Sequence, residues 1–459
     1  MGLVRIDVEP LLRPWTAQLA TRAVVVEQGA VACLPGLLTA LLPAGPWLLV
    51  ADPITWSAAG EAAAAALHRE GLEVTRHLLL PAVGVPVVVA ADGAIDALAE
   101  RLRLGGYRAA VAVGAGTVND MVKLAATQAG IPYAVVATAP SMNGYTSSLA
   151  APLQQGVKTT VACRPPVACV VDVDVVAAAP MRMLVAGLGD LLSKPVSNAD
   201  WRLAHRVVGA PYAPAVMDLI DAGAALLEGV AGRLPRRDPE AVGRLAASLC
   251  ISGLAMGLAG SSAPASGAEH LISHYLDMTH YAAGEPHDLH GCQVGVATLT
   301  TAALYEVVRS WDPRSLDRAD RLARHPEWSA RALEVEQRFG SLAPAVLPQA
   351  RQAHPTRDEL ARRLDLLSTQ WDDILAEVAT TLRPARALAA QLRAAGAPVT
   401  YAELGISDDR ARTAVLAARD IRPRYTVLHL AADLGQLPHW VDRALARGPL
   451  LASGAVGAA

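Results

Sequence analysis

The chain has 459 residues, of which 53% are hydrophobic and 18% charged, and its formal net charge is −3. This composition excludes a disordered protein, and a near-neutral charge without a basic stripe argues against nucleic acid as a partner. A chain of this length exceeds the usual size of one hydrophobic core, so we expect two domains.

Cysteine usage and apolar runs bear on the compartment. The five cysteines are scattered and form no Cys-x-x-Cys pair, which predicts neither a disulfide framework nor a thiolate zinc site. The N-terminus lacks the apolar core of a signal peptide, and charges or prolines interrupt every apolar run of membrane-spanning length. We therefore expect a cytoplasmic protein with no membrane partner, and the sequence leaves room for a homo-oligomer.

Short apolar runs alternate with helical patterns over the first 180 residues. Strands are expected at 23–26, 47–51, 74–80, 111–113, 133–137 and 167–171, helices at 34–42, 57–70 and 92–104, and a strand or helix at 86–91. This alternation predicts an α/β domain over 1–180, with a doubly wound, Rossmann-like parallel sheet.

Strand patterns end near residue 181. Helices are expected at 184–207, 217–234, 239–258, 269–278, 293–308, 333–339, 357–382, 384–395 and 408–416. The pattern predicts an all-α helical-bundle domain over 181–447, with a charged loop or surface helix at 309–328 and a disordered tail at 448–459.

A glycine turn joins the strand at 111–113 to the helix that follows it. Gly114 and Gly116 let backbone N–H groups face a ligand, and the helix start favours phosphate, so a diphosphate-bearing cofactor is the expected guest. The alternative is a tight strand-to-helix turn without a ligand. The turn at 138–144 also follows a strand, so we expect the two turns to share one cleft at the carboxyl edge of the sheet.

Polar groups interrupt the apolar helical half at three places, around Asp190, around His270 and His274, and around His290. One carboxylate and two imidazoles from separate helices would form a three-ligand site for a divalent cation with an open position. Alternatively, Asp190 is a helix N-cap, and a surface loop accounts for at least two of the histidines at 280, 287 and 290. His270 and His274 share a helix face, so one is expected to ligate while the other orients a neighbouring group or the substrate.

Several of these motifs resemble one known family. VAVGAGTVNDMVKLA, VVATAPSMNGYTSS, AGLGDLLSK, SGAEHLISHYLDM, LHGCQVGVAT and IRPRYTVLHLAADLG occur in the order found in the glycerol-1-phosphate dehydrogenases, and the bacterial branch is the most similar. That family belongs with the glycerol dehydrogenases, iron-dependent alcohol dehydrogenases and dehydroquinate synthases.

The resemblance implies roles for individual positions. Asp190, His270 and His290 match the metal ligands, with zinc as the expected metal and nickel or iron as alternatives. The positions that match the NAD or NADP site are Gly114, Gly116, Thr117 and Asp120 for the diphosphate, Thr138 and Ser141 on the nicotinamide side, and Asp52 for the adenosine ribose. An acid at position 52 would favour NAD by repelling a 2′-phosphate.

Three further residues are candidates for catalysis. Asn143 stands where the family has an aspartate, so a carboxylate that could hold substrate hydroxyls or relay a proton is replaced by an amide. His274 is expected near the metal, and Lys194 either approaches the substrate phosphate or balances the charge of the site. We expect Lys123, on the helix after the glycine turn, to be exposed.

The implied activity is a metal-dependent, NAD(P)H-linked reduction of a small phosphorylated ketone, with dihydroxyacetone phosphate to glycerol 1-phosphate as the default reaction. Because of Asn143, reduction of a related phosphonate or polyol ketone is an alternative. The same architecture would also suit a lyase or cyclase like dehydroquinate synthase, or a degenerate nucleotide-binding protein without activity.

Overall fold

The computed structural model of the protein describes residues 3–81, 87–154 and 157–448. The chain divides into two compact units. The first unit comprises Met1–Leu191 and Pro214–Ser262, and the second comprises Leu192–Ala213 and Ala263–Ala459.

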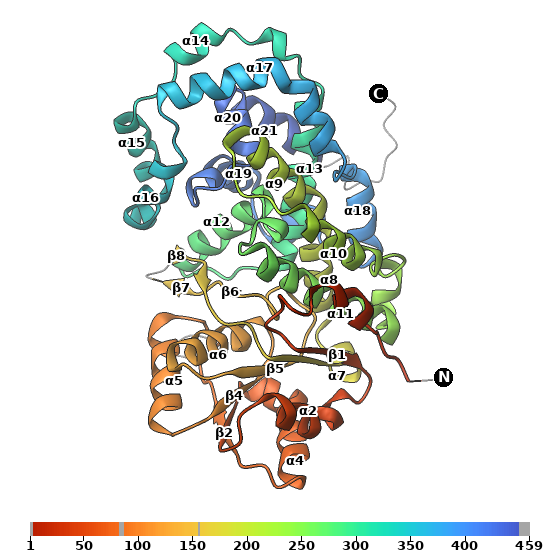
Figure 1. Ribbon diagram of the computed structural model, residues 1–459. Helices are drawn as coiled ribbons and strands as arrows, with labels where there is room; N and C mark the ends of the chain where they lie inside the picture. Colours follow the sequence, from red (N-terminus) through yellow and green to blue (C-terminus); the bar gives the residue numbers. More distant parts are fainter. Residues whose placement is uncertain (1–2, 82–86, 155–156, 449–459) are drawn as a thin grey trace. The chain divides into compact units, whose positions relative to one another are not determined.

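A six-stranded sheet forms the centre of the first unit (Figure 1), with the strand order β1-β10-β5-β4-β2-β3. The strands are β1 (Ala23–Glu27), β2 (Trp47–Ala51), β3 (Val74–Leu78), β4 (Ala109–Gly114), β5 (Tyr133–Ala137) and β10 (Ala168–Asp172). All pairings are parallel. The four inner strands are buried at every residue, because helices cover both faces of the sheet. The predicted doubly wound parallel sheet is confirmed.

Alternate residues of these strands face two different layers of helices. One core joins Leu49, Val111 and Val170 to the apolar sides of α2 (Leu34–Leu41) and α4 (Glu61–Arg69). On the other face, α6 packs on β4 and β5, α5 packs on α6, and α11 packs on β1 and β10. The bounds of these helices are α5 Asp92–Leu104, α6 Gly116–Ala129 and α11 Pro239–Ala259.

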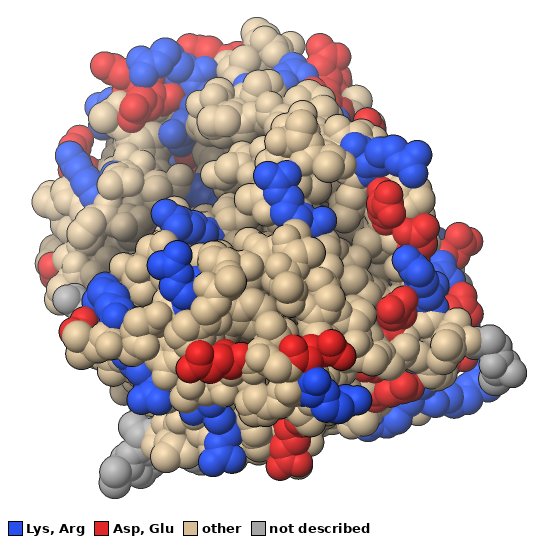
Figure 2. All heavy atoms as spheres, turned by 60° about the horizontal axis from the view of Figure 1, so that its bottom comes forward, with Lys and Arg blue, Asp and Glu red and all other residues tan. Residues whose placement is uncertain are grey.

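The other helices of the first unit are shorter. They are α1 (Glu9–Leu12), α3 (Pro53–Thr55), α7 (Val173–Ala178), α8 (Met181–Leu192, whose last residue falls in the second unit) and α10 (Pro214–Ala225). Acidic and basic side chains are interspersed over the face of the molecule shown in Figure 2.

Helix α11 makes the first unit larger than the sequence predicts. By length and composition it could cross a membrane, but 83% of its apolar stretch is buried inside the protein, as expected of a core helix. Because α11 packs on the sheet and α10 packs on α11, residues 214–262 belong with the strands rather than with the later helices. The compact units therefore do not divide at residue 181, where the sequence places the domain boundary.

The second unit is helical throughout the part of the chain that the structure describes. Its central helix, α13 (His290–Arg309), is buried along almost its whole length and packs against α12, α18 and α21. The remaining helices are α9 (Lys194–Val208), α12 (Ala268–Ala283), α14 (Arg318–Ala323), α15 (Trp328–Phe339), α16 (Ala343–Ala353), α17 (Arg357–Ala379), α18 (Ala385–Ala394), α19 (Asp408–Ala417), α20 (Val427–Asp433) and α21 (Leu437–Leu445). The predicted helical character of this half is confirmed.

Two predicted helices are each broken in two. The helix expected at 184–207 is interrupted at Ser193, and Pro195 lies in the first turn of α9, where its missing N–H is tolerated. The helix expected at 217–234 ends as α10 at Ala225, and Gly229 adopts a left-handed φ of 71° before a short 3-10 helix begins at Ala231.

Some elements were not predicted from the sequence. Two small antiparallel sheets pair β6 (Leu149–Ala150) with β9 (Val161–Ala162) and β7 (Leu153–Gln154) with β8 (Val157–Lys158). The helices α16, α20 and α21 are additional, and α14 lies within the charged stretch 309–328. Of the apolar run at 86–91, residue 86 lies outside the described residues and the rest forms no regular strand, and the predicted tail lies outside them beyond residue 448.

Candidate functional site

The predicted cofactor turn is the connection from β4 to α6. Gly114 ends the strand, Ala115 is the N-cap, and Gly116 is the first helical residue. A Cβ at Gly114 would overlap the Val118 side chain, and one at Gly116 would lie 3.0 Å from the Met142 side chain. Close packing therefore favours glycine at both positions, and the start of α6 is a helix N-terminus of the kind that favours an anion.

The second predicted turn lies beside the first. Strands β4 and β5 are neighbours in the sheet, with Gly114 opposite Ala137, and the Thr138 N–H donates to the Gly114 carbonyl oxygen at 3.2 Å. The exposed Thr117, the buried Thr138 and the half-buried Ser141 therefore occupy the same edge of the sheet. The two turns thus lie side by side at this edge, as expected, and a cleft that they share remains a prediction.

Two acidic candidates for the cofactor site also have structural roles. Asp52 follows β2 and caps α3: its Oδ1 accepts from the Thr55 N–H at 2.8 Å, and its own N–H donates to the Thr55 hydroxyl. In α6, Asp120 accepts from the Ala151 N–H at 3.1 Å, which ties the helix to the start of the small sheets. Contact of either carboxylate with the cofactor remains a prediction.

Asn143 and Asp190 are in direct contact. The Asn143 side-chain amide donates to Oδ1 of Asp190, and its backbone N–H donates to Oδ2, both at 2.9 Å. Asp190 is only 1% exposed and lies inside α8, so the N-cap interpretation of this residue is wrong. The amide that replaces the family's carboxylate is thus a donor that orients the predicted ligand.

Glycines of α8 and α11 allow this close approach. Gly187 lies in α8, and a Cβ there would overlap the carbonyl oxygen of Pro140. On α11, a Cβ at Gly253 would overlap the Thr146 hydroxyl and lie 2.8 Å from the Asn143 carbonyl oxygen. Gly187 therefore lies inside α8, where it allows the helix to pack closely against the turn at Pro140.

We expect Gly187→Ala to lower the free energy of unfolding by about 2–4 kcal/mol, because either α8 or the turn at Pro140 must shift. Urea unfolding of the two proteins measures the difference. Gly93→Ala is the matched control, since a Cβ at that helical glycine of α5 meets nothing within 4 Å. An equal effect of both substitutions would contradict the close packing of α8.

The second unit brings three predicted histidines together. The ring centroids of His270 and His274, on α12, lie 5.2 and 5.4 Å from that of His290, the first residue of α13. His290 therefore opens a helix, His280 is buried on α12, and His287 alone of the three lies in an exposed loop. The surface-loop interpretation fails for two of the three histidines.

Hydrogen bonds orient two of these rings. The Nδ1 atom of His270 lies 2.7 Å from Oε1 of Glu269, and Nδ1 of His290 lies 3.0 Å from the Ser273 hydroxyl. A ring held at Nδ1 presents Nε2 to a metal, and carboxylate–histidine pairs of this kind are common behind metal ligands. Nitrogen ligands from histidine with one carboxylate suit zinc, nickel or iron. The chemistry of these residues suits a divalent metal, but the described residues contain no group of three His, Cys, Asp or Glu side chains arranged as a metal site, so ligation by Asp190, His270 and His290 together remains a prediction.

A buried acidic pair, Asp200 and Glu269, lies behind His270 and was missed from the sequence. Asp200 accepts from the N–H groups of Ala268 and Val427, both at 2.7 Å, and from the Tyr305 hydroxyl at 2.6 Å. Burial first and then the charge of Glu269 raise the pKa of Asp200 to about 7. Asp200 thus joins the N-termini of α12 and α20 to α13. Helices α12 and α13 carry the three histidines, and α20 packs on α13. The only signal in the sequence was an aspartate within an apolar helical pattern.

The two lysines near these residues are both buried. Lys194 donates to the Ser193 hydroxyl at 3.2 Å and to the Ala265 carbonyl oxygen at 3.3 Å, so its role toward a phosphate remains a prediction. Lys123 is fully buried, and the expectation that it is an exposed helix lysine is wrong. Its ammonium group finds acceptors in the segment after Asn143, which the helical pattern alone does not reveal.

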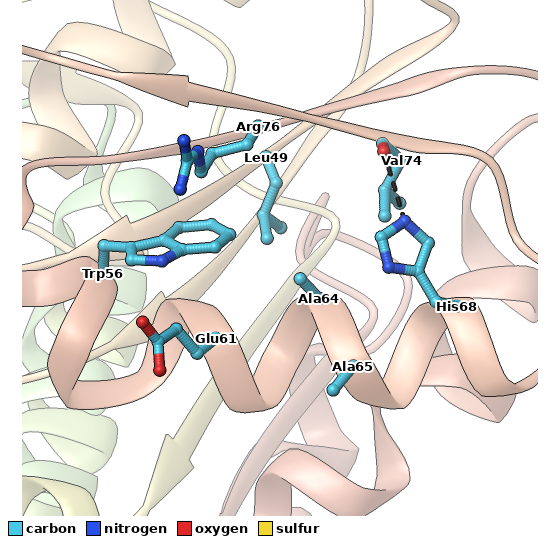
Figure 3. Close-up of a pocket in the computed structure, with 8 residues that line it drawn as sticks. All are labelled: Leu49, Trp56, Glu61, Ala64, Ala65, His68, Val74 and Arg76. Atoms are coloured by element: carbon cyan, nitrogen blue, oxygen red, sulfur yellow. Dashed lines mark hydrogen bonds between the residues drawn. The ribbon is translucent and has the colours of Figure 1, made fainter.

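A separate hollow of about 480 Å³ lies between α4 and strands β2 and β3 (Figure 3). Trp56 and Arg76 are stacked in it, with the guanidinium carbon 5.2 Å from the ring centroid, and His68 and Glu61 also line it. None of the predicted site residues lines this hollow, because it opens on a helix-covered face and not at the carboxyl edge.

Comparison with known proteins identifies the family. The model of the iron-containing alcohol dehydrogenases matches residues 25–180. The chain is 29% identical to a glycerol-1-phosphate dehydrogenase [NAD(P)+] of Halalkalibacterium halodurans, over 83% of this chain and 85% of that one. It is 30% identical to the protein of the same name from Bacillus licheniformis, over 77% of each chain.

A solved structure supports the fold. The glycerol dehydrogenase of Schizosaccharomyces pombe superposes with a TM-score of 0.63 over 94% of this chain and 90% of that one, at 17% identity. The predicted enzyme class, an alcohol dehydrogenase, is confirmed. The chain belongs to the glycerol-1-phosphate dehydrogenase family.

Proposed function

We propose that the protein is a metal-dependent reductase that converts dihydroxyacetone phosphate and NAD(P)H, with one proton, into glycerol 1-phosphate and NAD(P)⁺. The observation that carries the proposal is the contact between Asn143 and Asp190. Asn143 lies in the turn after β5, and β5 pairs with β4, whose glycine turn suits a diphosphate. The names of the relatives, which share most of their length with this chain, support the substrate.

The first unit would bind the cofactor. The start of α6 would hold the diphosphate through Gly114, Gly116 and Thr117, and Thr138 and Ser141 would line the nicotinamide side. Bound NAD(P)H would supply the hydride. Asp52 would accept the adenosine ribose hydroxyls through a carboxylate already fixed by its capping bonds, which would favour NADH over NADPH.

Asp190, His270 and His290 would hold the metal, with zinc as the default and nickel or iron as alternatives. A bound divalent metal polarises a carbonyl oxygen and so makes the ketone a better hydride acceptor. Asn143 fixes the Asp190 carboxylate, and Glu269 and Ser273 fix the imidazoles. These residues thus prearrange the ligands before substrate arrives.

His274 and Lys194 would act on the substrate. His274 stacks on His290 with the rings 20° from parallel, where it could donate a proton or hold a hydroxyl group of the ketone. Lys194 would place a compact positive charge near the phosphate. Because Asn143 cannot ionise, the proton would come from His274 or from water.

The proposal is tested by mixing purified protein with NADH or NADPH, dihydroxyacetone phosphate, and zinc, nickel or iron(II) in turn. Loss of near-ultraviolet absorbance of the reduced cofactor, with chiral analysis of the product, is the expected result. If no metal and neither cofactor supports oxidation, the proposed reaction is excluded.

A second substrate class is favoured by Asn143. Its amide donates to Asp190, whereas the family's aspartate could accept a hydrogen bond from a substrate hydroxyl. A phosphonate or polyol ketone with a different hydrogen-bonding edge is therefore an alternative. A panel of such ketones under the same conditions distinguishes the two by the ratio of their kcat/KM values.

A further inference from the structure

The Lys123 ammonium group donates three hydrogen bonds to one short segment of the chain, residues 144–149. The side chain is 0% exposed, and Nζ donates to the Gly144 carbonyl oxygen at 2.6 Å, the Leu149 carbonyl oxygen at 3.0 Å and the Ser147 hydroxyl at 3.2 Å. The Asp120 carboxylate lies 3.6 Å from Nζ and offsets its charge. Three donors thus meet three acceptors, all within 144–149.

The basic residues of the chain show why lysine matters at this position. Only three of the 40 basic residues are lysines, namely Lys123, Lys158 and Lys194, and the rest are arginines. Arginine presents its donors in one plane from a larger head group, whereas an ammonium can direct three N–H bonds to one side. In a chain whose basic residues are almost all arginines, the position with three clustered acceptors around a buried cation is thus a lysine.

The segment held by Lys123 begins directly after Asn143. Other bonds on it are between neutral groups: the Thr146 hydroxyl donates to the Cys250 carbonyl oxygen and the Tyr145 hydroxyl to the Ala139 carbonyl oxygen, both at 2.6 Å. Lys123 binds the carbonyl oxygen of the residue next to Asn143. Movement of Gly144 would therefore move the two N–H donors that hold Asp190.

We propose that Lys123 is a positioning residue for the reductase reaction, which fixes the 144–149 segment so that Asn143 holds Asp190 in its ligating orientation. The link to catalysis rests on the proposed function of Asp190. The link from Lys123 to the segment rests only on contacts within the first unit. The two links can therefore be tested separately.

Hydrogen exchange tests the link from Lys123 to the 144–149 segment. K123M removes the donors and leaves two buried carbonyl oxygens and the Asp120 carboxylate without their cation, so amides of residues 143–151 should exchange about tenfold faster or more. K123R keeps the charge but not the geometry and should also accelerate exchange of these amides. M121A is the matched control, because it also truncates a buried α6 side chain, about 200° around the helix from position 123.

Zinc affinity and kinetics test the link from this segment to Asp190 and to catalysis. Competition with a chelator should show zinc binding weakened about tenfold or more in K123M and K123R but not in M121A. With dihydroxyacetone phosphate and NADH, kcat should fall, and the KM for NADH is followed separately because Asp120, a predicted diphosphate residue, lies 3.6 Å from the Lys123 Nζ.

The outcomes separate the two ideas. Unchanged exchange of 143–151 in K123M and K123R, relative to M121A, would overturn the positioning role. Faster exchange with unchanged zinc affinity would confine Lys123 to a structural role and overturn the link to Asp190. If the unmodified protein reduces no ketone, the proposed function fails, while exchange and zinc titration still decide the role of Lys123.

Discussion

Replacing Asp190 with asparagine is expected to lower kcat/KM for ketone reduction by about 1000-fold and to weaken zinc binding by at least about tenfold. The substitution removes the only anionic ligand of the proposed site while keeping its size. The new amide also cannot satisfy its neighbours, because Asn143 offers one N–H to each of the two carboxylate oxygens. Whichever way the new amide turns, one donor faces another donor.

Steady-state kinetics and chelator competition measure the two effects. Asp238→Asn is the matched control, since Asp238 is another helix-associated carboxylate of the first unit, where it caps α11 by accepting from the Ala241 N–H at 3.0 Å. An asparagine retains that cap, so activity and zinc affinity should change by less than about twofold. Retention of full zinc affinity in Asp190→Asn would remove Asp190 from the metal site.

How much the sequence could predict depends on the range of the interactions involved. The inner strands could be predicted because burial on both faces leaves continuous apolar runs in the sequence. The two turns could be placed near each other because parallel strands end at the same edge of the sheet. These are local signals that a helix or strand carries in its own residues.

Contacts between distant residues gave no such signal. Lys123 reaches acceptors more than 20 positions away, and Asp200 meets the start of α12 almost 70 positions later. Helix α16 was missed because Pro344 and Pro348 read as breaks, although the first lies in its opening turn. The partner of Asn143 was not evident from the sequence either, because Asn143 and Asp190 lie 47 positions apart.

A second large effect is expected at Asp200, where Asp200→Ala should lower the free energy of unfolding by about 3–5 kcal/mol. The carboxylate is 1% exposed and accepts from Ala268, Tyr305 and Val427, so its removal leaves three donors without an acceptor in the interior. Urea unfolding at pH 6 measures the change. Asp312→Ala, at an exposed helix cap, is the control and should cost less than about 1 kcal/mol. Equal effects would mean that Asp200 does not join these helices.

The pH dependence of stability distinguishes the charge of Asp200 from its hydrogen bonds. Burial and the neighbouring Glu269 raise the pKa of Asp200 from 3.8 to about 7, so the folded protein binds a proton here that the unfolded chain releases near pH 4. The stabilisation is complete below about pH 4 and is lost as pH rises through 7, with roughly 2 kcal/mol lost between pH 5 and 7. Burial lowers the pKa of His354 to about 4, which gives the opposite trend over part of this range.

The informative quantity is therefore the difference between the unmodified protein and Asp200→Asn, which keeps the shape but cannot titrate. The free energy of unfolding of the unmodified protein should fall more steeply from pH 5 to pH 7 than that of the variant, and parallel curves would show that Asp200 stays ionised in the folded protein throughout this range.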